Sequence, residues 1–195
     1  MPRPKAFDPD RALDQAMQAF WANGYEATSI DDLVRTTGVN RASLYSAFGG
    51  KHALFLKALE RYTGAGLFAA LELEDEATAS RDILRRLFDR LITRCLEGGP
   101  AGAGAGCLIT NTICEFGARD EAVLTAARQA LARMENALDL IVRRGQARGE
   151  FDAAIKPREF ARYLLNAMQG LQVIAKVNPD ERALRQIAER TLAGL

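Results

Sequence analysis

Residues 28–51 read TSIDDLVRTTGVNRASLYSAFGGK and contain two short helical patterns separated by a turn. The first pattern begins at Thr28 or Ser29, residue types that cap helices, and has acidic residues in its first turn. A turn around Gly38 follows, and the second pattern covers 41–48 before a glycine pair ends it. The stretch therefore predicts two short helices joined by a tight turn, the arrangement of a helix-turn-helix.

The second helix of this pair has a polar face that packing does not need. The apolar residues that hold the two helices together are Ile30, Leu33, Val34, Val39, Leu44 and Phe48. In a helix-turn-helix the second helix enters the DNA major groove, and its first residues reach base edges. Arg41 stands at this position, where an arginine can donate two hydrogen bonds to guanine. Ser43, Tyr45 and Lys51 are suited to phosphate contacts, which set register without reading sequence.

Charge placement agrees with a DNA-facing helix, although the whole chain has a net charge of only +1. Residues 1–63 contain eight lysines and arginines and seven acidic residues, but 33–59 contain four cations and no acidic residue. Arg3 and Lys5 form a tail that can reach a backbone or a minor groove. The residues predicted to contact DNA are Arg3, Lys5, Thr28, Ser29, Asn40, Arg41, Ala42, Ser43, Tyr45, Ser46 and Lys51.

Composition excludes several classes of protein. With 195 residues, of which 48% are hydrophobic and 26% charged, the chain can bury a substantial core, so disorder is excluded as its main state. Its longest uncharged stretch, 98–114, includes five glycines and a proline, so we predict no membrane span. No signal-peptide pattern occurs, and three cysteines, an odd number, indicate reduced thiols. We expect a cytoplasmic protein.

Helical spacing continues through the rest of the chain. A first helix is expected from Asp8 to Gly24, and a long helix over 51–74. Thr78 or Ser80 is expected to cap the next helix. Further helices are predicted over 107–116 and 120–148, and from 157 and 179 onward. No segment alternates apolar and polar residues as half-buried strands do, so the predicted fold class is all-α.

Composition alone leaves open a helical hairpin in an unrelated bundle, with the cations on a solvated surface. The stretch 10–59, however, resembles the N-terminal domain of the tetracycline-repressor (TetR) family of bacterial transcription regulators. The sequence departs from the family pattern at Thr37, Gly50 and His52, which removes no predicted DNA contact but leaves the turn before Lys51 less defined. The residues that carry the resemblance are Ala19-Phe20, Gly24-Tyr25, Thr28-Ser29-Ile30, Gly38-Val39, Leu44-Tyr45, Phe48, Lys51 and Leu54-Phe55.

The resemblance implies a fold of about nine helices in two domains. Residues 1–50 are implied to form a three-helix DNA-binding domain, and 51–195 a larger helical domain for effector binding and dimerisation, linked by the helix 51–74. It also implies a repressor that binds a double-stranded, palindromic DNA operator as a homodimer. An unknown small molecule, or a thiol-reactive compound, is implied to release it from DNA.

Two apolar stripes near the end of the chain agree with a dimer interface. Small residues beside them, such as Ala167 and Gly170, permit close approach of helices. The alternative is that both stripes face only the core of one protomer. Two-fold symmetry is how helix-turn-helix proteins fill two half-sites, so we predict a homodimer. The predicted interface residues are Phe160, Tyr163, Leu164, Ala167, Met168, Leu171, Ile174, Leu184, Ile187, Ala188 and Thr191.

The effector site is less defined by the sequence, because apolar residues can line a pocket or simply fill the core. Cys107 follows a glycine-rich loop and begins a predicted helix, where the helix dipole favours a reactive thiolate. The setting resembles that of cysteines through which some TetR-family regulators respond, so we hypothesise that modification of Cys107 weakens DNA binding. The alternative is a small buried side chain. The predicted pocket residues are Phe88, Leu91, Ile92, Cys107, Ile113 and Met134.

Functions other than regulation are disfavoured. His52 is the only histidine, and the sequence has no His and Cys pairing typical of a metal site, no phosphate-cradling glycine motif and no Gly-x-Ser-x-Gly motif. We therefore expect no enzymatic activity, no metal and no cofactor. Among DNA-binding proteins, a non-specific architectural protein is the alternative, but such a protein does not need a large effector domain.

Overall fold

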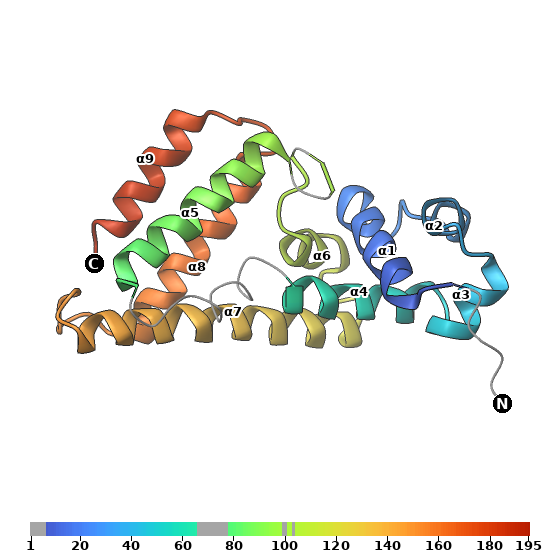
Figure 1. Ribbon diagram of the computed structural model, residues 1–195, viewed down its shortest axis with the longest axis horizontal. Coiled ribbons are helices and arrows are strands. Elements are labelled where there is room, and N and C mark those ends of the chain that lie inside the picture. The colour runs from blue at the N-terminus through green and yellow to red at the C-terminus, as the bar shows by residue number, and fades with distance from the viewer. Residues whose placement is uncertain (1–6, 66–77, 99–100, 103) are drawn as a thin grey trace.

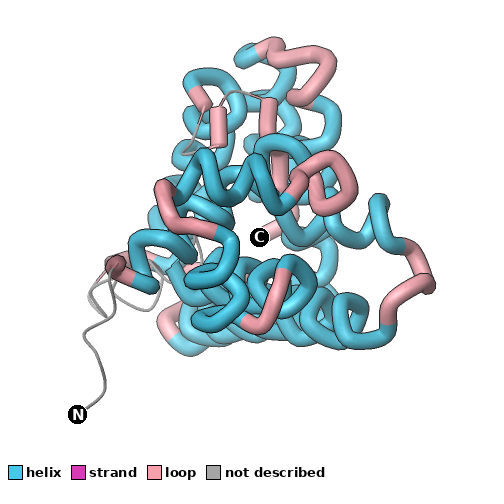
Figure 2. The backbone as a smooth tube through the Cα atoms, turned by 90° about the vertical axis from the view of Figure 1, so that its right-hand side faces the viewer, coloured by secondary structure: helices cyan, strands magenta, loops and turns pink. Residues whose placement is uncertain are grey.

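The computed structural model describes residues 7–65, 78–98, 101–102 and 104–195. These residues form nine helices and no strand, which confirms the all-α prediction (Figures 1 and 2). None of these helices is long and apolar enough to span a membrane. The helices are α1 (Pro9–Asn23), α2 (Ile30–Thr37), α3 (Arg41–Phe48), α4 (Lys51–Ala65), α5 (Ser80–Glu97), α6 (Leu108–Phe116), α7 (Glu121–Ala147), α8 (Pro157–Ile174) and α9 (Glu181–Leu192).

The molecule is elongated, and most of its helices gather in two groups, one at each end (Figure 1). At one end α1 and α3 pack against α4, and α2 packs against α1 and α3; at the other end α5, α8 and α9 lie together. The 27 residues of α7 span about 40 Å at 1.5 Å per residue, and α7 packs against α4, α5, α6 and α8. α6 lies between the two ends and contacts α1, α4 and α7. The part of the predicted helix 51–74 beyond Ala65 lies outside the described residues.

Local side-chain chemistry determines the ends of α2 and α3. Ser29 and Asp32 form a reciprocal capping box at the start of α2. Gly38 ends this helix with a φ of +65°, a left-handed conformation that glycine adopts without steric cost. Asn40 then caps α3 by accepting a hydrogen bond from the Ser43 N–H at 2.9 Å. The predicted pair of short helices with a tight turn is therefore confirmed.

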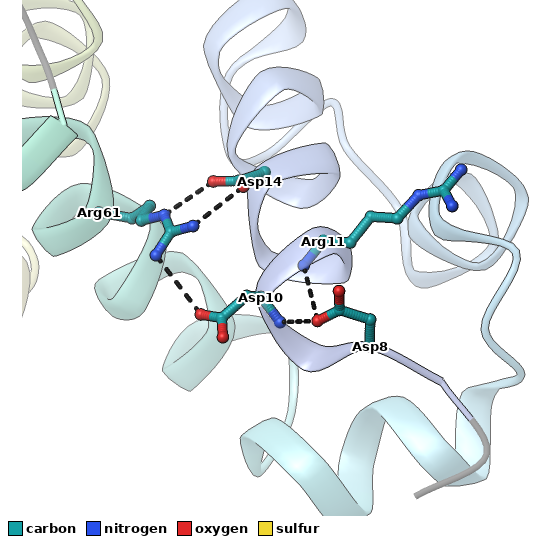
Figure 3. Close-up of polar contacts among 5 residues, drawn as sticks. All are labelled: Asp8, Asp10, Arg11, Asp14 and Arg61. Atoms are coloured by element: carbon teal, nitrogen blue, oxygen red, sulfur yellow. Dashed lines mark hydrogen bonds and ion pairs between the residues drawn. The ribbon is translucent and has the colours of Figure 1, made fainter.

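An ion-pair cluster ties α1 to α4 at the surface (Figure 3). Arg61 on α4 donates to both carboxylate oxygens of Asp14, at 2.8 and 3.0 Å, and to Asp10 at 3.4 Å. The Asp8 carboxylate caps α1 by accepting hydrogen bonds from the N–H groups of Asp10 and Arg11, at 3.0 and 3.3 Å. The acidic residues near the start of α1 therefore have two roles (Figure 3). Asp8 caps the helix, whereas Asp10 and Asp14 form ion pairs with Arg61.

An aromatic cluster of Phe20, Tyr25, Phe55 and Phe116 joins α1, α4 and α6. Phe55 is 1% exposed, and its ring centroid lies 5.0 Å from that of Phe20 and 4.9 Å from that of Tyr25. Its ring also stacks on Phe116 of α6, at 5.5 Å. Aromatic pairs at such distances add stability beyond the burial of their apolar area. The cluster therefore connects α1 and the turn after it, through the core, to α4 and α6.

A distant side chain, and not a local one, caps α5. The prediction that Thr78 or Ser80 caps this helix is wrong, because its N-cap residue is Ala79 and makes no side-chain cap bond. Instead, the Glu150 carboxylate accepts hydrogen bonds from the N–H groups of Ser80 and Arg81, at 2.6 and 3.3 Å. A carboxylate is favoured there because the first N–H groups of a helix are unpaired and carry partial positive charge.

Candidate nucleic-acid interface

α3 presents one side to solvent. Leu44 and Phe48 are buried on its inner side, where α3 contacts α2 and α4. A helix with a free polar face and a buried opposite face has the form that insertion into a groove requires. On this free face Arg41, Ala42, Tyr45 and Ser46 are exposed and Ser43 is half-buried.

Arg41, the first residue of α3, is paired with an acidic residue of α2. The Arg41 Nη2 atom lies 2.9 Å from Asp31 Oδ1, and the two side chains are 60% and 81% exposed. The neighbouring Asp32 has other partners: it accepts hydrogen bonds from Ser29 and pairs with Arg35. The hydrogen bonds from Ser29 lower the pKa of Asp32 below its ordinary value of 3.8. Both acidic residues of α2 thus have partners within the helix-turn-helix.

Three of the predicted contact residues lie at helix starts or in turns. Ser29 and Asn40 are exposed at the starts of α2 and α3. Thr28 is only 1% exposed, and its hydroxyl donates to the Gly24 carbonyl at 2.6 Å. The Thr28 side chain therefore stabilises the turn between α1 and α2 and, contrary to the prediction, is not available at the surface for a DNA contact.

The remaining cations of this end differ in their surroundings. Lys51 is half-buried, and its Nζ lies 4.1 Å from the centroid of the Tyr25 ring, a cation–π contact. Arg3 and Lys5 lie outside the described residues. Arg11 is exposed and extends away from the Asp8 cap (Figure 3), and no ion pair is found for it within the part of the chain that is described. Arg11 was not among the predicted contact residues, and in the sequence it stands between the acidic residues Asp10 and Asp14.

A carboxylate from α6 holds the turn that follows α1. Glu115 accepts hydrogen bonds from the backbone N–H groups of Tyr25 and Glu26, at 2.9 and 2.7 Å. Gly24 approaches so closely that a Cβ there would lie 3.0 Å from Glu115 Oε2. No motif marks Glu115 in the sequence, and its partners are about 90 residues away in the chain. Glu115 therefore joins α6 directly to the turn that leads into the helix-turn-helix.

A second polar contact links α4 to the start of α7. His52 Nε2 lies 2.7 Å from Asp120 Oδ2, and Asp120 caps α7 by accepting a hydrogen bond from the Val123 N–H at 3.1 Å. That backbone hydrogen bond, followed by the contact with His52, lowers the pKa of Asp120 below its ordinary value of 3.8. A carboxylate whose pKa is lower in the folded than in the unfolded state stabilises the fold when the pH is above the unfolded-state pKa. This stabilisation is lost as the pH falls through the folded-state pKa.

We expect the substitution Asp120→Asn to lower the free energy of unfolding by a small amount at pH 5. The decrease is expected to be smaller at pH 3, because the wild-type carboxylate is then partly protonated and has lost part of the charge that asparagine lacks. Asparagine keeps a capping oxygen, so the change removes mainly the charge. Urea denaturation of both proteins at the two pH values measures the difference. An equal difference at pH 3 and pH 5 would show that the Asp120 charge does not contribute.

The predicted effector-pocket residues lie in the core of the larger domain. Phe88, Leu91, Ile92, Cys107 and Met134 are at most 5% exposed, and Ile113 is half-buried. Phe88 and Ile92 border a cavity of about 260 Å³ between α5 and α9. Within the described ranges, no group of three or more His, Cys, Asp or Glu side chains is arranged to hold a metal ion.

Cys107 is the N-cap residue of α6, but it is only 3% exposed. Its thiol lies beside the hydroxyl of Tyr62, whose pKa is raised well above its ordinary value of 10.0, first by burial and then by Cys107. The exposed thiol is that of Cys114. Reactive cysteines need access to solvent, so the structure agrees with the alternative that Cys107 is a buried core residue.

The predicted dimer residues divide between the core and the surface. Contrary to the prediction, six of them are buried within the protomer: Leu164, Met168, Leu171, Leu184, Ala188 and Thr191. Tyr163, Ile174 and Ile187 are 44–50% exposed, and Phe160 and Ala167 are half-buried. The prediction assigned residues from both the buried and the exposed faces of α8 and α9 to one interface. Apolar spacing shows that a face is apolar, but not whether it packs against the same protomer or against a second one. Two further large apolar side chains near the end of α8 are exposed, Val173 at 44% and Val177 at 85%.

Two protein-family models match the sequence. The model described as bacterial regulatory proteins, tetR family, matches residues 12–58, and the tetracyclin repressor-like C-terminal domain matches residues 80–191. The HTH-type transcriptional repressor ComR of Escherichia coli (strain K12) is 33% identical over 192 residues, which cover 97% of this chain and 90% of ComR. The uncharacterized HTH-type transcriptional regulator YezE of Bacillus subtilis (strain 168) is 29% identical over the full length of both chains.

A solved structure of a relative agrees with these matches over nearly the whole chain. A cysteine mutant of the TetR family transcriptional regulator CifR, complexed with 26-bp double-strand operator DNA, superposes with a TM-score of 0.81 at 30% sequence identity and covers 98% of each chain. The two family models together include both the helix-turn-helix and most of the larger domain. The chain therefore belongs to the TetR family of bacterial transcriptional regulators, and it is a sequence-specific DNA-binding regulator and not an enzyme.

Proposed function

We propose that this protein is a repressor that binds a palindromic operator as a homodimer, with α3 of each protomer in a major groove of double-stranded DNA. The observation that carries the proposal is the exposed face of α3 with Arg41 at its first position. The operator-bound structure of the related CifR supports this mode of binding. We assign DNA binding to residues 1–50 and effector binding and dimerisation to residues 51–195, and we place the protein in the cytoplasm.

The side chains of this surface have two different tasks in the proposal. Arg41 reads a guanine through two hydrogen bonds, as the first residue of a recognition helix can. Ser43, Tyr45 and Lys51 contact phosphates, which position the protein without reading sequence. Since the Lys51 ammonium group is held over the Tyr25 ring, less of its freedom is lost when it meets a phosphate.

The proposed dimer forms through the exposed sides of α8 and α9. Ala167 and Gly170 permit close approach of two helices, and Gly170 is exposed. Two protomers paired in this way have the two-fold symmetry that half-sites about 34–36 Å apart require. Sedimentation at micromolar concentration tests this step, and a monomer there contradicts it. The residues proposed for the interface are Tyr163, Ala167, Gly170, Ile174 and Val177 at spacings of three and four, with Ile187 on α9.

Release from DNA follows, in the proposal, from the binding of a small molecule in the larger domain. Glu115 and Asp120 of that domain contact the α1–α2 turn and α4, so a shift of α6 or α7 changes how the helix-turn-helix is held. Screening compounds for loss of operator binding tests this step. A thiol-reactive effector requires Cys107 to become accessible, and unchanged operator affinity after complete labelling of Cys107 discards it.

Replacing Arg41 by alanine is expected to reduce discrimination at one base-pair position of each half-site by about 1–3 kcal/mol, because a bidentate contact with guanine is lost. The control Lys51→Ala is expected to weaken binding to all sequences alike and to reduce the dependence of affinity on salt. Bound DNA selected from a random pool identifies the operator, and titration of single-base operator variants at fixed salt measures both effects. An Arg41→Ala protein with the parent's base preference would contradict the proposed role of the α3 face.

The alternative function is that of a non-specific architectural DNA-binding protein. Such a protein binds through phosphate contacts alone and shows no preference between sequences. Competition between the selected palindrome and bulk DNA at fixed salt separates the two functions, since specific regulators prefer their site by at least about a thousandfold. Equal affinity for both DNAs refutes the proposed function.

A further inference from the structure

We infer that Asp31 on α2 is a specificity-determining residue, because it positions Arg41 for reading DNA. The inference rests on the proposed function, in which Arg41 reads a base. Asp31 acts as a positioning residue: it does not contact a base itself but acts through the guanidinium of Arg41. The distance from Asp31 Oδ1 to Arg41 Nη2 is 2.9 Å.

Folding does not explain this ion pair. Both side chains are more than half exposed, and exposed ion pairs contribute little to stability. The pair joins residues ten positions apart, on opposite sides of the α2–α3 turn, and that turn is already determined by Gly38 and the Asn40 cap. The contact therefore bears on the direction of the Arg41 side chain more than on the position of the two helices.

The chemistry of the guanidinium allows both partners at once. Arginine has five N–H donors in a planar fork, and Asp31 accepts from one terminal nitrogen only. The other N–H groups stay available for the O6 and N7 atoms of guanine. Because a long side chain loses rotamer freedom when it binds, a partner that restricts Arg41 beforehand reduces this cost for the correct base.

The charge of Asp31 acts in the same direction. The stretch from Leu33 to Leu59 contains no acidic residue, and the carboxylate of Asp32 is already engaged by Ser29 and Arg35. Asp31 is thus the acidic side chain beside the start of α3, where it repels phosphates and neutralises part of the Arg41 charge. Arg41 then binds an arbitrary phosphate less well, which increases the preference for the correct base over non-specific DNA.

The test uses full-length protein carrying Asp31→Ala, Arg41→Ala, or both, with titration of the selected operator, its single-base variants and a non-specific duplex at one salt concentration. Asp31→Ala is expected to reduce discrimination at the position read by Arg41 by about 2- to 10-fold, the effect of releasing one long side chain. It is also expected to raise affinity for the non-specific duplex. In the Arg41→Ala background, removing Asp31 is expected to leave discrimination at that position unchanged.

Glu26→Gln is the matched control, because Glu26 is an exposed acidic residue of the same domain and its backbone contact with Glu115 does not involve the side chain. This change is expected to alter affinity for all sequences alike. The urea midpoint of Asp31→Ala is expected to fall only slightly, because Asp31 also lies in the first turn of α2, where a carboxylate is favoured. The inference is overturned if Asp31→Ala retains full discrimination, or loses it equally with and without Arg41. A wild-type protein that prefers no sequence refutes the proposed function itself, whereas selective wild-type binding with an unchanged Asp31→Ala refutes only the inference.

Discussion

Truncating Phe55 to alanine is expected to lower the free energy of unfolding by about 3–5 kcal/mol. Phe55 is 1% exposed and is surrounded by the rings of Phe20, Tyr25 and Phe116 at 4.9–5.5 Å. Removing the ring leaves a cavity between α1, α4 and α6, and it ends three aromatic contacts at once. Because this cluster joins α6 to α1 and α4, the helices that support α2 and α3, we also expect weaker operator binding.

Urea denaturation at one protein concentration measures this effect, since the stability of a dimer depends on concentration. Phe55→Leu is the matched control and is expected to cost less, because leucine fills more of the space than alanine. A loss below about 1 kcal/mol for Phe55→Ala would show that the aromatic cluster is not a close-packed part of the core.

Replacing Gly145 by alanine is expected to destabilise the protein by about 2 kcal/mol, although alanine is the better helix former. Gly145 lies in α7, and a Cβ there would be 2.1 Å from the ring of Phe151, which is 5% exposed. At that distance the buried ring of Phe151 has to move. We therefore expect a loss of stability near the upper end of the usual range for overpacking, about 3 kcal/mol. The gain in helix propensity of about 1 kcal/mol offsets only part of it.

Gly64→Ala is the matched control for this prediction. Gly64 lies in α4, and no described atom comes within 4 Å of the Cβ that alanine adds there. The same substitution is therefore expected to stabilise the protein by up to about 1 kcal/mol. Urea denaturation of both variants compares them directly. Equal stabilisation by the two alanines would show that Phe151 does not pack against Gly145.

The helix-turn-helix was predictable because its determinants are local. Ser29 and Asn40 cap helices through N–H groups within three residues, and Gly38 supplies the left-handed turn between them. Such signals are complete within a short stretch of sequence, so the sequence was sufficient to place α2, the turn and α3. The exposed position of Arg41 followed from the same stretch, because removing the apolar residues left it on the free face.

The partners of the remaining elements could not be predicted in this way. Apolar spacing showed that α8 and α9 are amphipathic, but it assigned buried Leu164 and exposed Tyr163 to one interface. Likewise, Thr28 has the chemistry of a surface contact, yet its hydroxyl is used by the Gly24 carbonyl. Amphipathic spacing shows that a face is covered and leaves open whether the cover is the same chain or another.

Helix positions, the all-α class and the exposed polar face of α3 thus follow from residue order, since periodicity, capping and turn formation act over a few neighbouring residues. Contacts across the fold settled the rest: Glu150 caps a helix 70 residues away, Glu115 holds the turn after α1, and Phe151 requires Gly145. Each of these depends on two distant segments arriving at the same place, and only the folded chain brings them together.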